Sequence, residues 1–146
     1  MREAFMYKAL EEAKIAERLK EVPVGAVIVK DNKIIASAHN LREILKDPTA
    51  HAEILAIKKA AEFLGDWRLN GCEMYVTLEP CPMCAGAIIQ SRIKRLYIGT
   101  FDPVAGCCGS VVNMVQSKAL NVMIDVVWMY EEECAEILKK FFQSKR

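Results

Sequence analysis

The sequence predicts a single α/β domain in which a mixed five-stranded sheet carries helices on both faces. Segments with the period of a buried helical stripe alternate along the chain with short apolar runs that are typical of strands. Two of these runs flank the turn pair Asp31-Asn32, which predicts an antiparallel hairpin. Two others, residues 74–78 and 94–100, enclose a helical segment. They predict parallel strands, because no tight hairpin could join them.

The N-terminal region supplies one helix and the hairpin. Residues 3–20 predict a helix with one buried stripe, because apolar side chains recur there every three or four positions. Residues 22–29 and 34–38 are the hairpin strands, and Pro23 belongs at the start of the first. The helix is therefore expected to pack on a sheet that begins with this hairpin.

A second helix follows an irregular segment at residues 41–46. Asp47 or Thr49 is expected to cap the start of this helix, which ends near Gly65. Its expected buried stripe consists of Ile54, Ile57, Ala61 and Leu64.

The second half of the chain continues the alternation of strands and helices. A helix that starts at the cysteine motif and is apolar almost all round is expected to be buried between the two parallel strands. The elements expected after the second parallel strand are a loop at 101–110, one or two helical turns at 111–117, a fifth strand at 122–127 and a final helix that buries Cys134, Ile137, Leu138 and Phe141.

Length, charge and composition exclude several classes of protein. A chain of 146 residues is long enough for one domain with a sizeable core. The net charge of +1 gives no overall attraction for nucleic acid, so such a partner requires a local basic patch. With neither a signal-peptide core nor a run that could span a bilayer, we expect a cytoplasmic protein without a membrane partner. The six cysteines are then expected to be thiols.

Two short motifs carry the chemistry: His51-Ala52-Glu53 and Pro80-Cys81-Pro82-Met83-Cys84. One histidine and two cysteines are the ligands of a catalytic zinc site that keeps its fourth position for water. Glu53 is suited to carry protons to and from that water. A structural zinc ribbon is the alternative for a Cys-x-x-Cys pair, but the sequence has no second such pair.

Helix geometry predicts that the metal lies off the ends of two helices. Residues two apart on a helix point to nearly opposite sides, so His51 and Glu53 cannot share a metal on its flank. Cys81 and Cys84, three apart at a helix start, do share a face. We therefore expect one ion between two helix N-termini, whose partial positive charge favours thiolates and bound hydroxide. This place also follows the carboxyl end of strand 74–78, where open α/β sheets bind ligands.

His-x-Glu followed by Pro-Cys-x-x-Cys is the signature of zinc-dependent nucleobase deaminases. The chain resembles one family of that superfamily, the TadA family of tRNA adenosine deaminases, over nearly its whole length. The matching stretches are residues 22–27, 39–40, 47–53, 75–87 and the pair Phe141-Phe142. The resemblance implies a three-layer α/β/α cytidine-deaminase-like fold and a single zinc-dependent deaminase domain over residues 1–146. It also implies a homodimer and hydrolysis of the wobble adenosine of a tRNA anticodon to inosine.

The same resemblance assigns roles at the two motifs. His51, Cys81 and Cys84 hold one Zn²⁺ per subunit, and zinc-activated hydroxide attacks C6 of the adenine. Glu53 is the catalytic proton shuttle, which protonates a ring nitrogen and then the departing amine. Asn40 resembles the base-contacting asparagine of the family, with an ordinary turn asparagine as the alternative.

Contacts to the tRNA anticodon stem-loop are expected from aromatic and basic residues. Phe141 and Phe142 either stack on the anticodon, pack under the sheet, or do one each. The basic candidates, each of which could instead be a solvated surface charge, are Arg42, Lys46, Arg68, Arg92, Lys94, Arg95, Lys139, Lys140, Lys145 and Arg146. Val104, Trp128 and Gln143 depart from the family, which often has lysine, glycine and arginine at these positions. Each departure removes a charge or alters a bend near the expected RNA side.

Two alternative functions remain open at this point. One keeps the chemistry but takes a free nucleobase or nucleotide, such as guanine or a cytosine compound, and the pI of 7.6 favours it slightly. The other is a zinc-stabilised RNA-binding module without catalysis. Glu53 argues against that module, because a structural site has no need of a carboxylate beside a ligand.

Overall fold

The computed structural model describes residues 1–145, which form four helices and seven strands. In chain order these are α1 (Arg2–Arg18), β1 (Gly25–Lys30), β2 (Lys33–His39), α2 (Ala52–Leu64), β3 (Cys72–Leu78), α3 (Pro82–Gln90), β4 (Arg95–Thr100), β5 (Gln116–Ser117), β6 (Val122–Met123), β7 (Asp125–Trp128) and α4 (Glu132–Ser144). None of the helices in this part of the chain combines the length and apolarity that crossing a membrane requires.

Five strands form one mixed sheet in the order β2-β1-β3-β4-β7. β1 and β2 are joined by Asp31 and Asn32, which both have positive φ (50° and 62°), as a turn that matches the twist of a hairpin requires. β1 also pairs antiparallel with β3, whereas β3 with β4 and β4 with β7 are parallel. The predicted five-stranded mixed sheet, its hairpin and its parallel pair are confirmed.

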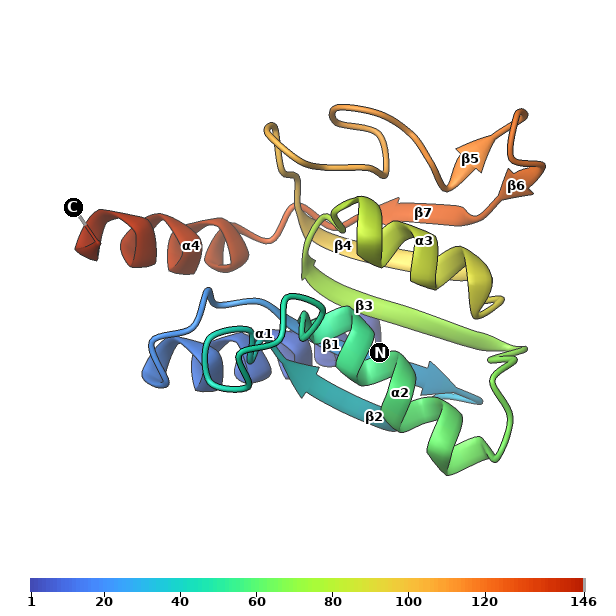
Figure 1. The fold of residues 1–146 in the computed structure, drawn as a ribbon, viewed down its shortest axis with the longest axis horizontal. Coiled ribbons are helices and arrows are strands. Elements are labelled where there is room, and N and C mark those ends of the chain that lie inside the picture. Colours follow the sequence, from blue (N-terminus) through green and yellow to red (C-terminus); the bar gives the residue numbers. More distant parts are fainter. Residues whose placement is uncertain (146) are drawn as a thin grey trace.

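Helices cover both faces of the sheet, as Figure 1 shows. α2 and α3 lie side by side on one face and begin at the same end of it. α1 covers the opposite face against β1 and β3, and α4 packs against α1 and β4. The result is the expected three-layer arrangement, with two helix starts close together at one end of the sheet.

The α1 and α4 layer follows the predicted periodicity. α4 buries the four residues expected from their spacing, Cys134, Ile137, Leu138 and Phe141. The layer also lies very close to the sheet: a Cβ on Gly25 would lie 2.0 Å from the carbonyl oxygen of Ala9, and one on Gly99 would lie 2.7 Å from Sγ of Cys134. Glycine is therefore needed at both strand positions.

The start of α2 differs from the prediction. His51 is the N-cap, instead of Asp47 or Thr49. Asp47 accepts hydrogen bonds from the amide and the hydroxyl of Thr49 (2.8 and 2.7 Å) in a separate turn, so its capping chemistry is used before the helix begins.

The buried residues of α2 and α3 differ from the prediction. Ala52, Ala56 and Ala60 are fully buried in α2, because small side chains let the helix approach the sheet. The expected stripe of Ile54, Ile57, Ala61 and Leu64 is only half-buried. α3 buries Cys84, Ala85 and Ile88, but its remaining apolar residues are half-exposed, so the prediction of a helix buried all round was wrong.

The segment between β4 and β7 was predicted least well. Residues 111–117 are not helical: the amides of Val111 and Val112 both donate to the carbonyl of Gly106, and β5 follows. The expected strand 122–127 is two elements, because β6 pairs with β5 in a separate small sheet and β7 joins the main sheet. Between them the amide of Ile124 donates to the carbonyl of Val115 (2.9 Å) and interrupts the strand.

Candidate metal centre

Two helix N-termini meet beyond the carboxyl end of β3. His51 is the N-cap of α2 and Cys81 is the N-cap of α3, so both have extended backbone just before a first helical turn. Pro82 occupies the first position of α3, where its missing N–H would have had no helical partner. Cys84 lies two residues further into that first turn. Both helix dipoles therefore favour negative charge at this place.

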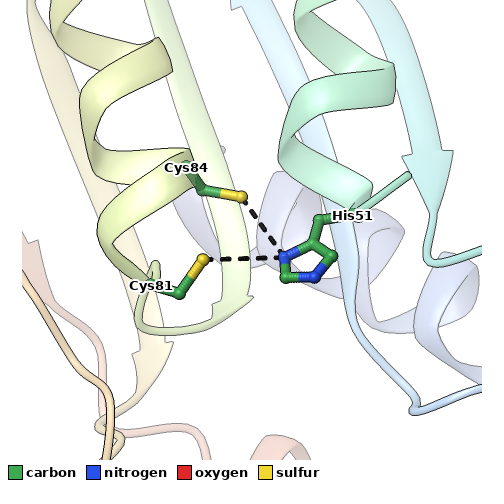
Figure 2. A group of neighbouring side chains, drawn as sticks. All are labelled: His51, Cys81 and Cys84. Atoms are coloured by element: carbon green, nitrogen blue, oxygen red, sulfur yellow. Dashed lines mark hydrogen bonds between the residues drawn. The ribbon is translucent and has the colours of Figure 1, made fainter. Parts of the chain in front are cut away.

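The structure brings the three side chains together with their donor atoms facing one another. Figure 2 shows Nδ1 of His51 directed toward both sulfur atoms, at 3.6 Å from Sγ of Cys81 and 3.5 Å from Sγ of Cys84. All three donor atoms lie within 4.8 Å of one another. Tetrahedral zinc, with bonds of about 2.0 Å to nitrogen and 2.3 Å to sulfur, separates such atoms by about 3.6 Å. The group could therefore hold a tetrahedral ion as it stands.

The two thiols share one negative charge. Hydrogen bonding with Cys84 lowers the pKa of Cys81 to about 4, and the same contact together with burial raises the pKa of Cys84. Contact with Cys81 also raises the pKa of His51. A divalent cation would compensate both thiolates, and this donor set suits zinc better than a hard, oxygen-seeking ion.

Glu53 lies beside this group without belonging to it. The side chain is 4% exposed on the first turn of α2, and burial raises its pKa to about 7. A carboxyl group that titrates near neutral pH can both accept and donate a proton under ordinary conditions. The arrangement therefore provides a proton carrier next to a possible metal site.

A cavity of about 320 Å³ opens at the same place and is lined by His51, Glu53 and Cys81, together with apolar residues from the strand ends. This size is at the small end of the range for small-ligand sites, about 300–1,000 Å³. Asn40 lines it as well: its Nδ2 donates to the carbonyl of Val22 (3.2 Å), and its Oδ1 accepts from the amide of Arg42 (3.1 Å). Asn40 is thus a turn asparagine and a cavity residue at once.

Two buried carboxylates that the sequence analysis did not single out hold the loops around this cavity. Glu21 accepts hydrogen bonds from the amides of Glu43 and Ile44 (3.0 and 2.7 Å), next to Arg42 in the cavity wall. Glu79 accepts hydrogen bonds from three amides of the loop after β4. Asp102 belongs to this loop and lines the cavity. The partners of Glu21 and Glu79 are 22 to 31 residues away, so no local pattern could reveal them. The only sequence signal was a charged residue at the end of an apolar run.

The fold separates the two phenylalanines of α4. Phe141 is 9% exposed and belongs to the buried face, whereas Phe142 is 53% exposed. Their rings meet edge-on with centroids 5.4 Å apart. Of the alternatives open from the sequence, the arrangement corresponds to one packed ring and one accessible ring.

The basic candidates are spread over the surface. Arg42 lines the cavity. Arg95 pairs with Glu73 and Asp125 (3.4 and 3.2 Å), and Arg68 and Arg92 lie over Trp67, beyond the opposite end of α2. Lys139, Lys140 and Lys145 accompany Phe142 near the end of α4, and Arg146 lies outside the described residues. All six cysteines are free thiols, with Cys107 and Cys108 buried in the loop after β4.

Comparison with known proteins gives consistent matches. A family model of MafB19-like deaminases matches residues 1–146. The chain is 50% identical to a tRNA-specific adenosine deaminase of Bacillus subtilis, over 99% of this chain and 90% of that protein. It is 48% identical to the protein of the same name from Aquifex aeolicus, over 99% and 96%. A solved tRNA:A34 deaminase superposes with a TM-score of 0.89 at 48% identity, over 92% and 99% of the two chains. A guanine deaminase structure from Bacillus subtilis superposes with a TM-score of 0.66 at 42% identity, over 69% of this chain and 65% of that chain.

Proposed function

The chain belongs to the MafB19-like deaminase family. From its full-length similarity to tRNA-specific adenosine deaminases we propose that it converts the wobble adenosine of a tRNA anticodon to inosine. We also propose that residues 1–146 form one zinc-dependent deaminase domain. The observation that carries the proposal is the set of three donor atoms at tetrahedral spacing, next to a buried glutamate in a cavity.

In this proposal His51, Cys81 and Cys84 hold one zinc ion per subunit. Zinc bound there would lower the pKa of a water molecule enough for attack on C6 of adenine at neutral pH. The two helix starts keep the three side chains in place, with Cys84 buried and His51 and Cys81 half-buried, so little ordering is needed when the ion binds.

Glu53 moves the protons. Its carboxyl group has a pKa of about 7, so it can take a proton from the attacking water and deliver it to a ring nitrogen of the base. It then takes the remaining proton from the hydroxyl group now on C6 and passes it to the amine, so that the C6–N bond breaks, the C6 carbonyl forms and ammonia leaves. Because the side chain is nearly excluded from solvent, the proton it holds is not exchanged freely with bulk water during these steps.

The remaining cavity residues select the substrate. An anticodon base is already unpaired, so it can be splayed into a small pocket at little cost. Asn40 is positioned by its two backbone contacts to present its amide to that base. Phe142 and the nearby lysines of α4 are proposed to contact the anticodon stem-loop, with Phe142 as a stacking platform. Phe141 then supports it from the core.

The experiment that tests this function measures inosine formation on an arginine tRNA with an ACG anticodon, and on its isolated anticodon stem-loop. Zinc-replete protein should deaminate both RNAs. Phe142→Ala should raise KM for the stem-loop by about 5- to 150-fold, through loss of about 1–3 kcal/mol of stacking, and leave kcat nearly unchanged. Absence of inosine with zinc-loaded protein would refute the proposal.

Deamination of a free base is the second candidate. The guanine deaminase of Bacillus subtilis supports it, because it is 42% identical over 69% of this chain. The tRNA-specific relatives cover 99% of the chain and are therefore the stronger support. Product assays on free guanine, adenine and cytidine separate the two: rapid ammonia release from guanine with no reaction on tRNA would favour the second candidate.

We also propose that the protein is a homodimer. The outer side of α2 and α3 supports this, because Ile54 and Met83 remain half-exposed and Phe63 is 69% exposed there. Light scattering coupled to size-exclusion chromatography should give twice the chain mass of 16.4 kDa. A monomer at micromolar concentration would contradict this assembly without affecting the proposed chemistry.

A further inference from the structure

We propose that Glu79 is a positioning residue for substrate binding: its buried carboxylate holds the segment 102–110 as one wall of the substrate cavity. Glu79 lies between the end of β3 and the metal motif, yet it contributes no donor atom to the group formed by His51, Cys81 and Cys84. The proposal rests on the deaminase function proposed above for its activity measurement only.

The side-chain hydrogen bonds of Glu79 all go to one loop. Its Oε1 accepts from the amide of Asp102 (2.9 Å), and its Oε2 accepts from the amides of Cys108 and Ser110 (3.0 Å each). The hydroxyl of Ser110 donates a fourth hydrogen bond, to Oε1. One carboxylate thus ties together the two ends of a nine-residue segment, counted from Asp102 to Ser110.

Burial makes these bonds strong. Glu79 is 2% exposed, and the structure gives it no ion pair within residues 1–145, so the four donors supply its compensation. Hydrogen bonds from amides to a buried carboxylate are roughly twice as strong as those between neutral groups. Removing the charge would leave several N–H donors without their acceptor.

The loop that Glu79 holds forms part of the cavity. Asp102 and Ala105 line it together with Glu53 and Arg42. Asp102 is fixed further by its own side chain, whose Oδ1 accepts from the amides of Val104 and Ala105 (2.9 and 3.2 Å). Movement of the Asp102 backbone would therefore carry this entire turn, and with it the wall of the cavity.

Packing around the carboxylate leaves no room for adjustment. A Cβ on Gly106 would lie 2.4 Å from the carboxyl carbon and Oε1 of Glu79, and 2.5 Å from the carbonyl oxygen of Asp102. Gly106 does not have a positive φ, so backbone conformation does not explain why glycine stands here. The close approach of the carboxylate is the reason that glycine is required at this position. Gly106→Ala should consequently disturb the same wall from the opposite side.

The test compares Glu79→Gln with Ser91→Ala. Glutamine keeps one oxygen but turns an NH₂ group toward N–H donors, so the loop should loosen. KM for the anticodon stem-loop should rise about tenfold, while kcat per bound zinc stays within about threefold. Ser91→Ala removes another buried hydrogen bond, to the carbonyl of Ile88 (3.0 Å) at the far end of α3, and should lower Tm without changing KM.

Hydrogen exchange measured by mass spectrometry provides a second readout. Amide hydrogens in peptides covering residues 102–110 should exchange faster than in wild type in Glu79→Gln. In Ser91→Ala their exchange rate should be unchanged. An unchanged KM despite faster exchange would overturn the proposal and leave Glu79 as a purely structural residue. A loss of kcat alone would also overturn it, by indicating a role in the chemical step.

Two further variants keep the proposal testable if Glu79→Gln does not fold. Ser110→Ala removes one of the four donors and should raise KM about threefold. Gly106→Ala should raise KM with little change in kcat. No change in KM for either variant would refute the proposal. Wild-type protein that forms no inosine would instead refute the deaminase function, and hydrogen exchange would still report whether Glu79 holds the loop.

Discussion

The metal centre and the cavity walls are two parts of one site that are held in different ways. His51, Cys81 and Cys84 are placed by the starts of α2 and α3, and thus by regular structure and short-range geometry. The walls are loops, and each is fixed by one buried carboxylate from a distant part of the sequence, Glu21 or Glu79. The difference teaches that each metal-binding side chain is placed by the start of its own helix, whereas the shape that admits a substrate depends on hydrogen bonds from loops to single buried carboxylates.

The largest effect should come from disrupting the group of donor atoms at the starts of α2 and α3. Cys84→Ala removes one of the three proposed zinc ligands, so the protein should lose zinc and all measurable deamination. Metal analysis after gel filtration should fall from one equivalent to nearly none. Cys134→Ala is the matched control, because this thiol is equally buried but lies on α4, and it should keep its zinc. Retention of zinc by the Cys84 variant would contradict the ligand assignment.

Glu53→Gln should separate the chemistry from the metal site. Glutamine has nearly the same shape but cannot carry a proton, so kcat should fall by about 10²- to 10⁴-fold. Zinc content and Tm should remain close to wild type, because Glu53 is not part of the donor group. Single-turnover inosine formation measures the effect. Activity within a few-fold of wild type would remove Glu53 from the mechanism.

The pH dependence of stability should report the buried state of Glu53. Its pKa is about 7 in the folded protein and about 4.5 in the unfolded chain, so between these values the unfolded chain has lost a proton that the folded protein keeps. The free energy of unfolding should therefore fall as pH rises from 4.5 to 7, by about 3 kcal/mol. Urea unfolding with a chelator present measures it. Glu53→Gln should flatten this slope, and equal slopes would contradict the assignment.

The smallest effect should come from weakening the cavity wall that Glu21 holds. Glu21→Gln weakens the hydrogen bonds to the amides of Glu43 and Ile44, which should cost about 1–2 kcal/mol of stability and raise KM a few-fold. Thermal unfolding and steady-state kinetics on the stem-loop measure the two effects. The same change at the exposed Glu62 should alter neither. A drop in kcat with an unchanged KM would show that the two parts of the site are not independent.

What could be predicted from the sequence follows the same division. The hairpin at Asp31-Asn32, the parallel pair and the buried face of α4 depend on local spacing, and all were predicted. The proximity of His51 to Cys81 and Cys84 followed from motif spacing and helix geometry. The hairpin and the buried face of α4 come from short sequence separation or a strong period, which one-dimensional patterns record. His51 and Cys81 are 30 residues apart, and it was the chemistry of a shared ligand set that predicted their meeting.

The rest depends on contacts that follow no regular period in the sequence. Residues 111–117 were expected to be helical, but their amides are taken up by Gly106 and its neighbours. The strand expected at 122–127 is divided at Ile124 by a hydrogen bond to Val115. Ile54 appeared to be a core residue of α2, although alanines face the sheet instead. The first two partners are only five to nine residues away, but these hydrogen bonds follow neither the helical nor the strand period, so a periodicity pattern does not record them.

The arrangement of the metal ligands has a consequence for folding. His51 and Cys81 are 30 residues apart and follow different strands, so they meet only after β1 has paired with β3 and α2 and α3 have docked on the same face. Closing such non-local pairs is a slow step, and metal capture can only follow it. A nascent or partly folded chain therefore offers metal ions the local thiol pair of Cys81 and Cys84 without the imidazole of His51. High-affinity uptake is then a late event, and it marks chains in which the sheet is already complete.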